Sequence, residues 1–278
     1  MSNKLQQVAF QGERGAYSEA AAIAHFGPDI NPYPCAEFDD LFRAVVEGVC
    51  DFGMAPIENS LGGSIHRNYD LLLRHDLTIV GEEYFRVVHC LIAQPGVALG
   101  EVKRAYSHPQ ALAQCEGTIE RLGLERVVTY DTAGSVKLLQ ERGIMDGAAI
   151  ASRRAAEVYG MNVLMEGVED DTENYTRFLV LSREAAPPPT TVPGKTSIVF
   201  ATINTPGSLF KALSVFALRD IDLTKIESRP LKGKPFDYYF YLDFAGSLAE
   251  ARCQKALDHL AEYATLLRVL GSYPRHFM

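Results

Sequence analysis

The sequence predicts an α/β protein with a second, smaller α+β domain at its C-terminus. Between Val8 and Ser182, short apolar strands alternate with helical segments, which is the pattern of helices layered on a largely parallel sheet. Residues 185–194, AAPPPTTVPG, form a stiff stretch that is poor in core residues, so we expect a linker between domains there. The chain of 278 residues is long enough for each domain to have its own core.

Composition narrows the possible classes of protein. Hydrophobic residues make up 47% of the chain and charged residues 22%, and no apolar run approaches the ~18 residues of a membrane span. Met1 to Phe10 carries one lysine and no leader pattern, so we expect a cytoplasmic protein that does not insert into membranes. The formal net charge of −8, without a cluster of Lys or Arg, argues against nucleic-acid binding.

Cysteine and histidine usage indicates neither a disulfide framework nor a metal site. The five cysteines are widely scattered and odd in number, which is typical of reduced, mostly buried thiols. The seven histidines show no metal-ligand spacing. We therefore expect small molecules or other protein chains as partners.

The N-terminal elements follow a strand-then-helix order. A strand at 8–10 leads into a loop with two glycines, where Ser18 is the expected N-cap of a helix at 19–26. This loop lacks both GxGxxG and GK[ST], so nucleotide binding is not indicated. Apolar residues at helical spacing then predict a helix at 37–48 that packs on the sheet.

The stretch 55–70, APIENSLGGSIHRNYD, reads as a binding loop at the end of a strand. Glu58, Asn59 and Ser60 offer a carboxylate, an amide and a hydroxyl within reach of one small ligand. The Gly-Gly pair that follows lets the backbone come close to that ligand. A turn without a ligand is the alternative interpretation of the same composition.

Further polar residues follow other strands. Ser107 is the expected cap of a helix whose first turn holds Pro109, and Thr132 opens the next helix. In open α/β sheets, ligands bind at the carboxyl ends of the strands, where these corners lie. Thr176 and Arg177 stand where a later strand begins and are expected to point into a cleft. The β-rich run at 84–93 is expected to cross from one lobe to another.

Beyond the linker, the predicted elements follow the order strand, helix, strand, strand, helix, strand. This βαββαβ order is that of a ferredoxin-like α+β domain. The expected ranges are 197–203, 206–218, 221–226, 238–244, 249–263 and 267–270.

Taken together, these motifs resemble the prephenate dehydratase family, including the arogenate dehydratases. The matching stretches are GAYSEAA at 15–21, PIENSLGGSIHRNYDLL at 56–72, YSHPQALAQC at 106–115, DTA at 131–133 and NYTRF at 174–178. After the linker, LTKIESRP at 223–230 resembles the ACT regulatory domain that these enzymes carry. The resemblance covers essentially the whole chain, in order.

The resemblance implies a domain division and a reaction. A catalytic domain at 1–184 would have two lobes around a cleft, as in periplasmic binding proteins, followed by the linker and an ACT domain at 195–278. The enzyme would be a carbon–oxygen lyase of phenylalanine biosynthesis. It would convert prephenate to phenylpyruvate, with loss of carbon dioxide and water and without a cofactor or metal. Dehydration of arogenate, which forms phenylalanine directly, is the alternative, and the stretch SLGGSIHRNYDLL looks closer to the arogenate enzymes.

The family's roles can be carried onto matching positions of this sequence. Thr176 would hydrogen-bond or protonate the leaving hydroxyl, with Arg177 and Phe178 shaping the site, and Glu58 is the expected proton source. The residues expected to hold the substrate are Asn59, Ser60, Ser107, Gln114 and Thr132. Helix-cap roles stay open for Ser107 and Thr132, and a surface role stays open for Gln114.

In the ACT-like part, phenylalanine is the expected effector, bound where two subunits of a homodimer or homotetramer meet. The expected effector-binding residues are Asn204, Gly207, Ser208, Leu209, Glu227, Ser228 and Arg229. The sequence departs from the family in two places. Glu13-Arg14 stands where many members have a proline, and Gly207-Ser208-Leu209-Phe210 replaces a GALV-like turn.

Two other classes of protein fit parts of the sequence. An amidase or esterase would pair Ser60 or Ser107 with His66 or His108 as nucleophile and base, although no GxSxG motif is present. A small-molecule binding protein without catalysis would also have two lobes around a cleft. The regulatory-type domain argues against the second class.

Overall fold

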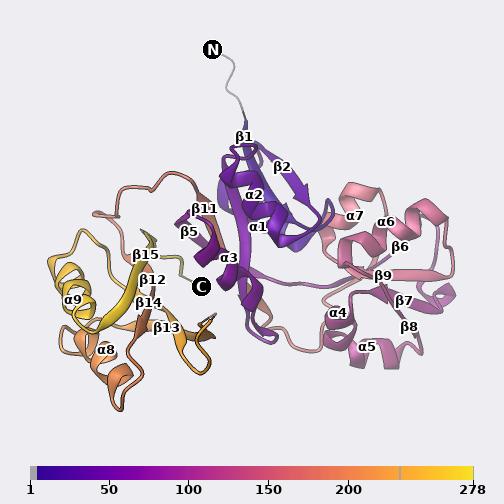
Figure 1. Ribbon diagram of the computed structural model, residues 1–278. Helices are drawn as coiled ribbons and strands as arrows, with labels where there is room; N and C mark the ends of the chain where they lie inside the picture. Colours follow the sequence, from indigo (N-terminus) through magenta and orange to yellow (C-terminus); the bar gives the residue numbers. More distant parts are fainter. Residues whose placement is uncertain (1–4, 232, 278) are drawn as a thin grey trace. The chain divides into compact units, whose positions relative to one another are not determined.

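The computed structural model describes residues 5–231 and 233–277 (Figure 1). The chain groups into two compact units. The first unit consists of Met1–Ile65 and Glu83–Phe178, and the second of His66–Glu82 and Leu179–Met278. The second unit is thus built from two stretches that lie far apart in the sequence.

The first sheet has the strand order β2-β1-β3-β11-β5, and β4 pairs with β3. Two helices, α1 (Tyr17–Phe26) and α2 (Phe38–Val46), connect the parallel strands β1, β2 and β3. A capping box formed by Glu37 and Asp40 starts α2 by satisfying free backbone N–H groups. The strands are β1 (Gln6–Gln11), β2 (Ile30–Cys35), β3 (Phe52–Asn59), β4 (Gly63–Ser64), β5 (Thr78–Arg86) and β11 (Tyr175–Ser182).

The second sheet has the order β10-β6-β9-β7-β8. Strand β7 is parallel to β8 and β9, whereas β6 is antiparallel to β9 and β10. Helices α4 and α5 cover one face of this sheet, and α6 and α7 cover the other (Figure 1). The elements are β6 (Cys90–Ala93), η1 (Leu99–Glu101), β7 (Arg104–Ser107), α4 (Pro109–Gln114), α5 (Glu116–Arg121), β8 (Glu125–Val128), α6 (Thr132–Arg142), β9 (Gly147–Ala151), α7 (Arg153–Tyr159) and β10 (Asn162–Glu166).

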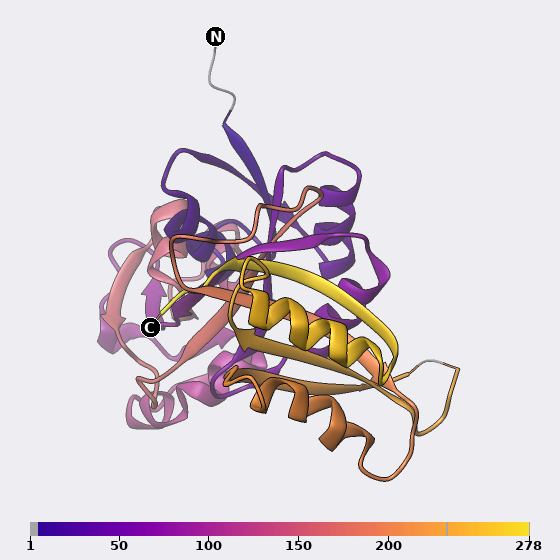
Figure 2. The same cartoon turned by 90° about the vertical axis from the view of Figure 1, so that its left-hand side faces the viewer.

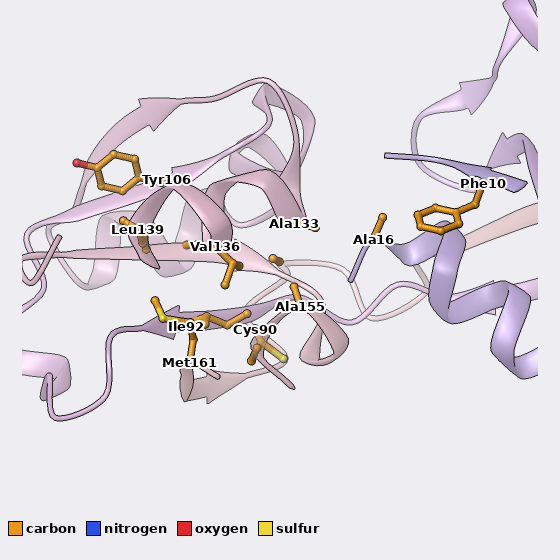
Figure 3. Close-up of a cluster of buried hydrophobic side chains, with 13 residues drawn as sticks. Phe10, Ala16, Cys90, Ile92, Tyr106, Ala133, Val136, Leu139, Ala155 and Met161 are labelled. Atoms are coloured by element: carbon orange, nitrogen blue, oxygen red, sulfur yellow. The ribbon is translucent and has the colours of Figure 1, made fainter. Parts of the chain in front are cut away.

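Alternation along the strands of the second sheet produces two separate cores. Ile92 and Ala149 face the cluster under α6 and α7, whereas their neighbours Leu91 and Ile150 face the cluster under α4 and α5. The first cluster also includes Phe10 of β1 and Ala16, so it continues toward the first sheet (Figure 3). This shared packing joins the two lobes of the first unit.

The C-terminal domain is a four-stranded sheet of order β13-β14-β12-β15 with two helices. Helices α8 and α9 lie side by side on one face of that sheet (Figure 2). Their apolar faces and the strands bury a cluster that includes Phe200, Phe216, Leu242 and Leu260. The elements are β12 (Gly194–Thr202), α8 (Ser208–Ala217), β13 (Leu223–Pro230), β14 (Tyr238–Ala245), α9 (Ala251–Ala261) and β15 (Ala264–Pro274).

Helix α3 (His66–Arg74) and the start of β5 belong to the same unit as the C-terminal domain. The ring of Tyr69 meets the ring of Tyr241 edge-on at 4.9 Å between centroids, and the Tyr241 hydroxyl donates to the Tyr69 carbonyl at 2.8 Å. Lys195 Nζ lies 2.6 Å from a carboxylate oxygen of Glu82, and both side chains are almost fully buried. These contacts give the second unit a core that neither stretch forms alone.

The predicted combination of a two-lobed α/β domain and a ferredoxin-like domain is confirmed. The expectation of one largely parallel sheet is wrong, because the run at 84–93 splits into β5 and β6 and supplies a strand to each of two mixed sheets. Ser18 is also not a cap, since α1 begins at Tyr17 with Ala16 at the N-cap position. Within residues 5–231 and 233–277, no helix is long and apolar enough to span a bilayer.

Candidate active site

A cavity of about 440 Å³ lies within the first unit, lined by residues of both lobes. Its walls come from β1, α1, β3, the residue before α3, the segment before β6, the starts of α2, α4 and α6, and β11. The lining consists of Gln11, Tyr17, Ser18, Phe38, Pro56, Asn59, Ile65, Val87, His89, His108, Gln110, Ala111, Gln114, Tyr130, Asp131, Thr132, Thr176 and Phe178.

Asn59, at the end of β3, fixes the direction of the hydrogen bonds in this cavity. Its Oδ1 accepts the backbone N–H groups of Leu61 at 3.1 Å and Gly62 at 2.7 Å, so its amide group can be oriented in only one way. Its Nδ2 therefore donates to Thr176 Oγ1 at 3.0 Å and to Asn174 Oδ1 at 2.8 Å. Because Thr176 accepts from Asn59, its own hydroxyl hydrogen is left to donate into the cavity.

The same logic extends through two more amides. Asn174 Nδ2 donates to Gln114 Oε1 at 3.3 Å, and His89 Nε2 lies 3.0 Å from that same oxygen. An oxygen acceptor requires a hydrogen on His89 Nε2, so in the neutral ring Nδ1 is the free acceptor. The chain of bonds that starts at two backbone N–H groups thus sets the tautomer of a buried histidine.

Tyr17 closes this network from the first turn of α1. Its hydroxyl lies 2.7 Å from His89 Nδ1 and 3.0 Å from the Val88 carbonyl. Burial, reinforced by nearby Cys90, raises the pKa of the Tyr17 phenol well above its ordinary value. Burial also lowers the pKa of His89, although the hydrogen bond to Gln114 acts in the opposite direction. Both groups are therefore neutral near pH 7, and the single phenol hydrogen is shared between His89 Nδ1 and the Val88 carbonyl.

Two glycines allow the close approaches that form this site. Gly15 has φ +87°, and a Cβ there would lie 2.5 Å from the Cα of Ala155, so no other residue fits between the start of α1 and α7. A side chain at Gly62 would collide with the amide of Gln110, which lines the cavity. Gly62 thus leaves room for the Gln110 side chain of the second lobe, whereas Gly63 is favoured by its backbone conformation at φ +76°.

Five of the predicted site residues meet at the cavity: Asn59, Gln114, Thr132, Thr176 and Phe178. Thr132 is the first residue of α6, but Asp131 is the N-cap and accepts the Ala133 N–H at 3.2 Å. Their roles toward a substrate stay predictions, since the cavity is described without one.

The four other predicted site residues, which are outside the lining that the described residues form, are Glu58, Ser60, Ser107 and Arg177. Ser107 Oγ donates to the Ile150 carbonyl at 2.6 Å. Its neighbour His108 does line the cavity and is the N-cap of α4. Ser60 Oγ donates to the Glu173 carbonyl at 2.8 Å and accepts the Tyr175 N–H at 2.9 Å. Glu58 lies in β3 opposite Ser64 of β4, and its role as proton source stays a prediction.

Arg177 shows why neighbours on a strand differ in role. Side chains alternate along a strand, so Thr176 and Phe178 reach the cavity while Arg177 points to the other face. Its guanidinium carbon lies 5.9 Å from the ring centre of Tyr84. We assign it to packing of the first sheet.

Sequence reasoning missed Tyr17, Ser18, His89, Gln110 and Asp131, which all line the cavity. Tyr17 and Ser18 lie in the GAYSEAA motif, so the motif itself was the available signal. His89 sits at the entry to β6, in a β-rich run that also contains Arg86. Its partner Tyr17 is 72 positions away, which no local pattern reveals.

The predicted effector residues of the C-terminal domain fall into two groups. Glu227 and Arg229, on alternate positions of β13, pair with α3: His66 Nε2 lies 3.2 Å from Glu227, and Arg229 lies 3.3 Å from Asp70. The second group lies before or at the start of α8 and consists of Asn204, Gly207, Ser208 and Leu209. Ser228 lies between Glu227 and Arg229 on β13, so its side chain faces the opposite side of the strand.

Within the described part of the chain, no group of three or more His, Cys, Asp or Glu side chains is arranged to hold a metal ion. All five cysteines are buried and unpaired. Burial raises the pKa of the Cys35 thiol to about 12 and that of Cys90 to about 11, so these thiols stay protonated.

Comparison with known proteins, by sequence family and by sequence identity, finds relatives that are named as prephenate or arogenate dehydratases. The family model for prephenate dehydratase matches residues 8–186. An arogenate dehydratase/prephenate dehydratase of Arabidopsis thaliana is 54% identical, covering 96% of this chain and 72% of that protein, and an arogenate dehydratase of Petunia hybrida is 53% identical, covering 96% and 71%.

Two solved structures match over nearly the full length of both chains. One is a prephenate dehydratase from Arthrobacter aurescens in complex with L-Phe, with a TM-score of 0.89, 33% identity, and coverage of 97% of this chain and 90% of that chain. The other is described as a novel type of quorum-quenching acylase, with a TM-score of 0.91, 38% identity and coverage of 98% of each chain.

These relatives correct the expected cellular location. The prediction of a cytoplasmic protein is wrong, because several relatives about half identical to this chain, including the Arabidopsis thaliana proteins, are named as chloroplastic. The composition of a folded domain does not report its compartment, which is set by addressing signals. The family match over most of the chain and the identity above 50% to two of its relatives agree, and the chain belongs to the prephenate dehydratase family.

Proposed function

We propose that the cavity of the first unit catalyses the decarboxylating dehydration of prephenate or arogenate. Prephenate would give phenylpyruvate and arogenate would give phenylalanine, each with one carbon dioxide and one water. The observation that carries the proposal is the Thr176 hydroxyl, which accepts from Asn59 at 3.0 Å and so directs its hydrogen into the cavity. The enzyme would be classed as a carbon–oxygen lyase.

The chemistry makes modest demands on the protein. Loss of carbon dioxide from one end of the ring supplies the electron pair that expels the hydroxyl at the other end, and the product ring becomes aromatic. The site must orient the substrate and place a donor at the oxygen where negative charge develops. Thr176 meets the second need, because Asn59 holds it as a donor, Asn174 accepts from Asn59, and Gln114 accepts from Asn174. Each turnover consumes one proton, which leaves as part of the water.

The two substrates differ only in a keto or an amino group on the side chain. Asp131, the one carboxylate in the lining, favours a ligand that carries an ammonium group over one that does not. Both curated relatives named above include arogenate in their names. We therefore infer that arogenate is the better substrate of the two.

The experiment is a direct comparison of the two compounds with the purified protein. Phenylpyruvate formation from prephenate and phenylalanine formation from arogenate are measured under the same conditions. We expect turnover of both and a higher kcat/KM for arogenate. Asp131→Asn should reduce the ratio of kcat/KM for arogenate to kcat/KM for prephenate. Absence of turnover of either compound by a folded protein would remove the proposal.

We also infer that the C-terminal domain is an ACT domain that binds phenylalanine and regulates the enzyme as a homodimer or homotetramer. The ferredoxin-like order of β12 to β15 supports this, as does the related dehydratase that was solved in complex with L-Phe. The polar residues of β13 are tied to α3, which follows directly after the binding loop. Calorimetry with phenylalanine and light scattering test binding and assembly, and the absence of both binding and a rate change would end this part of the proposal.

Amide hydrolysis is a second candidate activity, because the structure with a TM-score of 0.91 is described as an acylase. The serine and histidine of the second lobe do not form a nucleophile and base pair: the Ser107 hydroxyl donates to a backbone carbonyl, and His108 Nδ1 accepts the Gln110 N–H at 3.2 Å. A panel of N-acyl amides assayed beside arogenate tests this activity. Thr176→Ala distinguishes a shared site from a separate one.

A further inference from the structure

Four helices begin at the cavity, α1, α2, α4 and α6, and α1 is the one among them whose N-terminus has no side-chain cap. A capping box of Glu37 and Asp40 caps α2. His108 caps α4 and Asp131 caps α6, each by accepting a backbone N–H of the first turn. Helix α1 begins after Ala16, which has no side chain able to accept such a bond. Within the described residues, the backbone N–H groups of Ser18 and Glu19 make no hydrogen bond to the protein. A helix N-terminus with free N–H groups attracts anions.

A second feature at the same place points to a ligand. The side chain of Ser18 lines the cavity, and the residue is only 8% exposed. Its hydroxyl makes no hydrogen bond within residues 5–231 and 233–277. This hydroxyl opens onto the cavity and has no partner among the residues that the structure describes, so it is available to bind a group that enters there. The free hydroxyl and the free N–H groups of α1 therefore offer donors to one group.

The charges around the cavity restrict what that group can be. The lining contains neither Lys nor Arg, and every lining residue belongs to the described part of the chain. Glu19, the acidic residue of the first turn, is turned away: its carboxylate accepts the Gly15 N–H at 2.5 Å and pairs with Arg14 at 3.2 Å and Arg154 at 3.4 Å. An anion that enters the cavity thus depends on neutral donors for its binding.

We propose that the start of α1 is the subsite for the side-chain carboxylate of the substrate, with Ser18 Oγ and the N–H groups of Ser18 and Glu19 as donors. This inference rests on the proposed function for the identity of the ligand, since both prephenate and arogenate carry that carboxylate. Loss of the ring carboxylate as carbon dioxide would be favoured if that group is weakly solvated in the cavity.

The subsite is held in place from both sides. Tyr17, the first residue of α1, is bound through its hydroxyl to His89 and to the Val88 carbonyl. Ser152 Oγ donates to the Gly15 carbonyl at 2.5 Å, and Gly15 packs against the backbone of Ala155. The donors of Ser18 and Glu19 are therefore preorganised, so little entropy is lost when a carboxylate binds.

A matched pair of ligands tests the subsite: 3-phenylpropanoate, which carries the carboxylate, and 3-phenylpropanamide, which does not. We expect the wild-type protein to bind the acid at least about 10-fold more tightly than the amide, as for a hydrogen bond to a charged group. Ser18→Ala should reduce this ratio about three- to tenfold. Ser18→Asp, which places a carboxylate at the subsite, should abolish the preference for the acid. The effect on turnover should fall on KM, with kcat within about threefold in Ser18→Ala.

The controls separate the subsite from folding and from the proposed function. Ser214→Asp makes the same change in α8, where the Ser214 hydroxyl donates to the Lys211 carbonyl, and should leave the ratio unchanged. The backbone amide resonances of Ser18 and Glu19 should shift on titration with the acid and not with the amide, whether or not the protein turns over any substrate. An unchanged ratio in folded Ser18→Asp, or equal wild-type affinities for acid and amide, would overturn the inference even in an active dehydratase.

Discussion

Arg229 of β13 and Asp70 of α3 are joined by two hydrogen bonds of 3.3 Å between guanidinium and carboxylate. Two positions earlier on β13, Glu227 contacts His66 at the start of the same helix. Helix α3 directly follows the loop that carries Asn59 and Ile65, both of which line the cavity. Strand β13, which carries the predicted effector residues Glu227 and Arg229, thus contacts helix α3, the helix that follows the binding loop.

The first prediction concerns the strength of this Arg229–Asp70 pair. Both side chains are partly exposed, so solvent screening limits their coupling to about 0.5–1 kcal/mol. A double-mutant cycle with Asp70→Asn and Arg229→Gln, measured by urea unfolding, checks that value. The fully surface-exposed pair Arg153–Glu166 is the control and should give a smaller coupling. Additive effects of Asp70→Asn and Arg229→Gln would show that the coupling free energy between the two side chains is close to zero.

Thr176→Ala should lower kcat by about 10²- to 10⁴-fold, because the donor to the leaving hydroxyl is lost. The melting temperature should change little, since Asn59 Nδ2 keeps Asn174 Oδ1 and the Tyr175 carbonyl as acceptors. Thr176→Ser restores the hydroxyl and should recover most of the rate. Steady-state kinetics and thermal unfolding of the three proteins provide the measurement. A rate within threefold of wild type in Thr176→Ala would exclude the hydroxyl from the chemistry.

His89 makes stability depend on pH in a defined direction. Burial lowers its pKa in the folded protein, whereas the unfolded chain keeps a pKa near 6.5. As pH falls below about 6.5, the unfolded state binds the proton first, so the free energy of unfolding decreases down to the folded pKa. His89→Gln should remove this part of the acid destabilisation while keeping a donor toward Gln114. Glu169 raises the pKa of His89, so Glu169→Gln should lower it further.

Histidine resonances followed by NMR between pH 4 and 8 measure this directly. His25, which is partly exposed and pairs with Glu83, provides the internal comparison. A His89 pKa at or above 6.5 would contradict the assignment of a neutral ring that accepts from Tyr17.

The sequence predicted the layers of this protein better than its contacts. The alternation of strands and helices predicted the α/β class, and the βαββαβ order predicted the C-terminal domain. The two lobes were implied by the family resemblance and not by the alternation. The position of α3 was not predictable, because its amphipathic pattern indicates a buried face but not which sheet covers it. The motif residues Asn59, Gln114 and Thr176 do converge on the cavity.

The errors at the site have physical reasons. Ser18 looked like a cap because Ser favours that position, but the helix begins two residues earlier than predicted and leaves the Ser18 hydroxyl in the cavity. Arg177 could have been assigned to the other face from strand alternation alone. His89 and Tyr17 form a pair only through the fold that brings α1 against the second lobe.

The buried ion pair of Lys195 and Glu82 should contribute strongly to the fold of the second unit. Their side chains are 2% and 0% exposed, so removal of one carboxylate or ammonium group takes an opposite charge away from the other in a poorly solvated place. Glu82→Gln should destabilise the protein by about 3–5 kcal/mol. The double variant Glu82→Leu with Lys195→Met should recover most of that loss. Chemical unfolding of the three proteins checks both values, and a cost below about 1 kcal/mol for Glu82→Gln would show that Lys195 finds another partner.

Ending the chain after Ser182 should damage more than regulation, because the segment His66–Glu82 belongs to the same compact unit as the C-terminal domain. Arg268 donates to the carbonyls of Leu73 and His75 at 3.4 and 3.1 Å, and Gly271 approaches the Ile79 carbonyl so closely that no side chain fits there. Without these contacts, the carbonyls at the end of α3 lose their donor Arg268, and the ring of Tyr69 loses its contact with the ring of Tyr241.

We therefore expect the shortened chain to melt at least several degrees lower, to bind a hydrophobic dye and to exchange the amide hydrogens of 66–82 rapidly. Its dehydratase activity should also decrease when residues 66–82 lose their structure, since α3 follows directly after the loop of Asn59. Arg268→Gln in the full chain is the milder control and should loosen the end of α3 alone. A shortened chain with wild-type melting temperature and protected amides at 66–82 would show that this segment needs no support from the C-terminal domain.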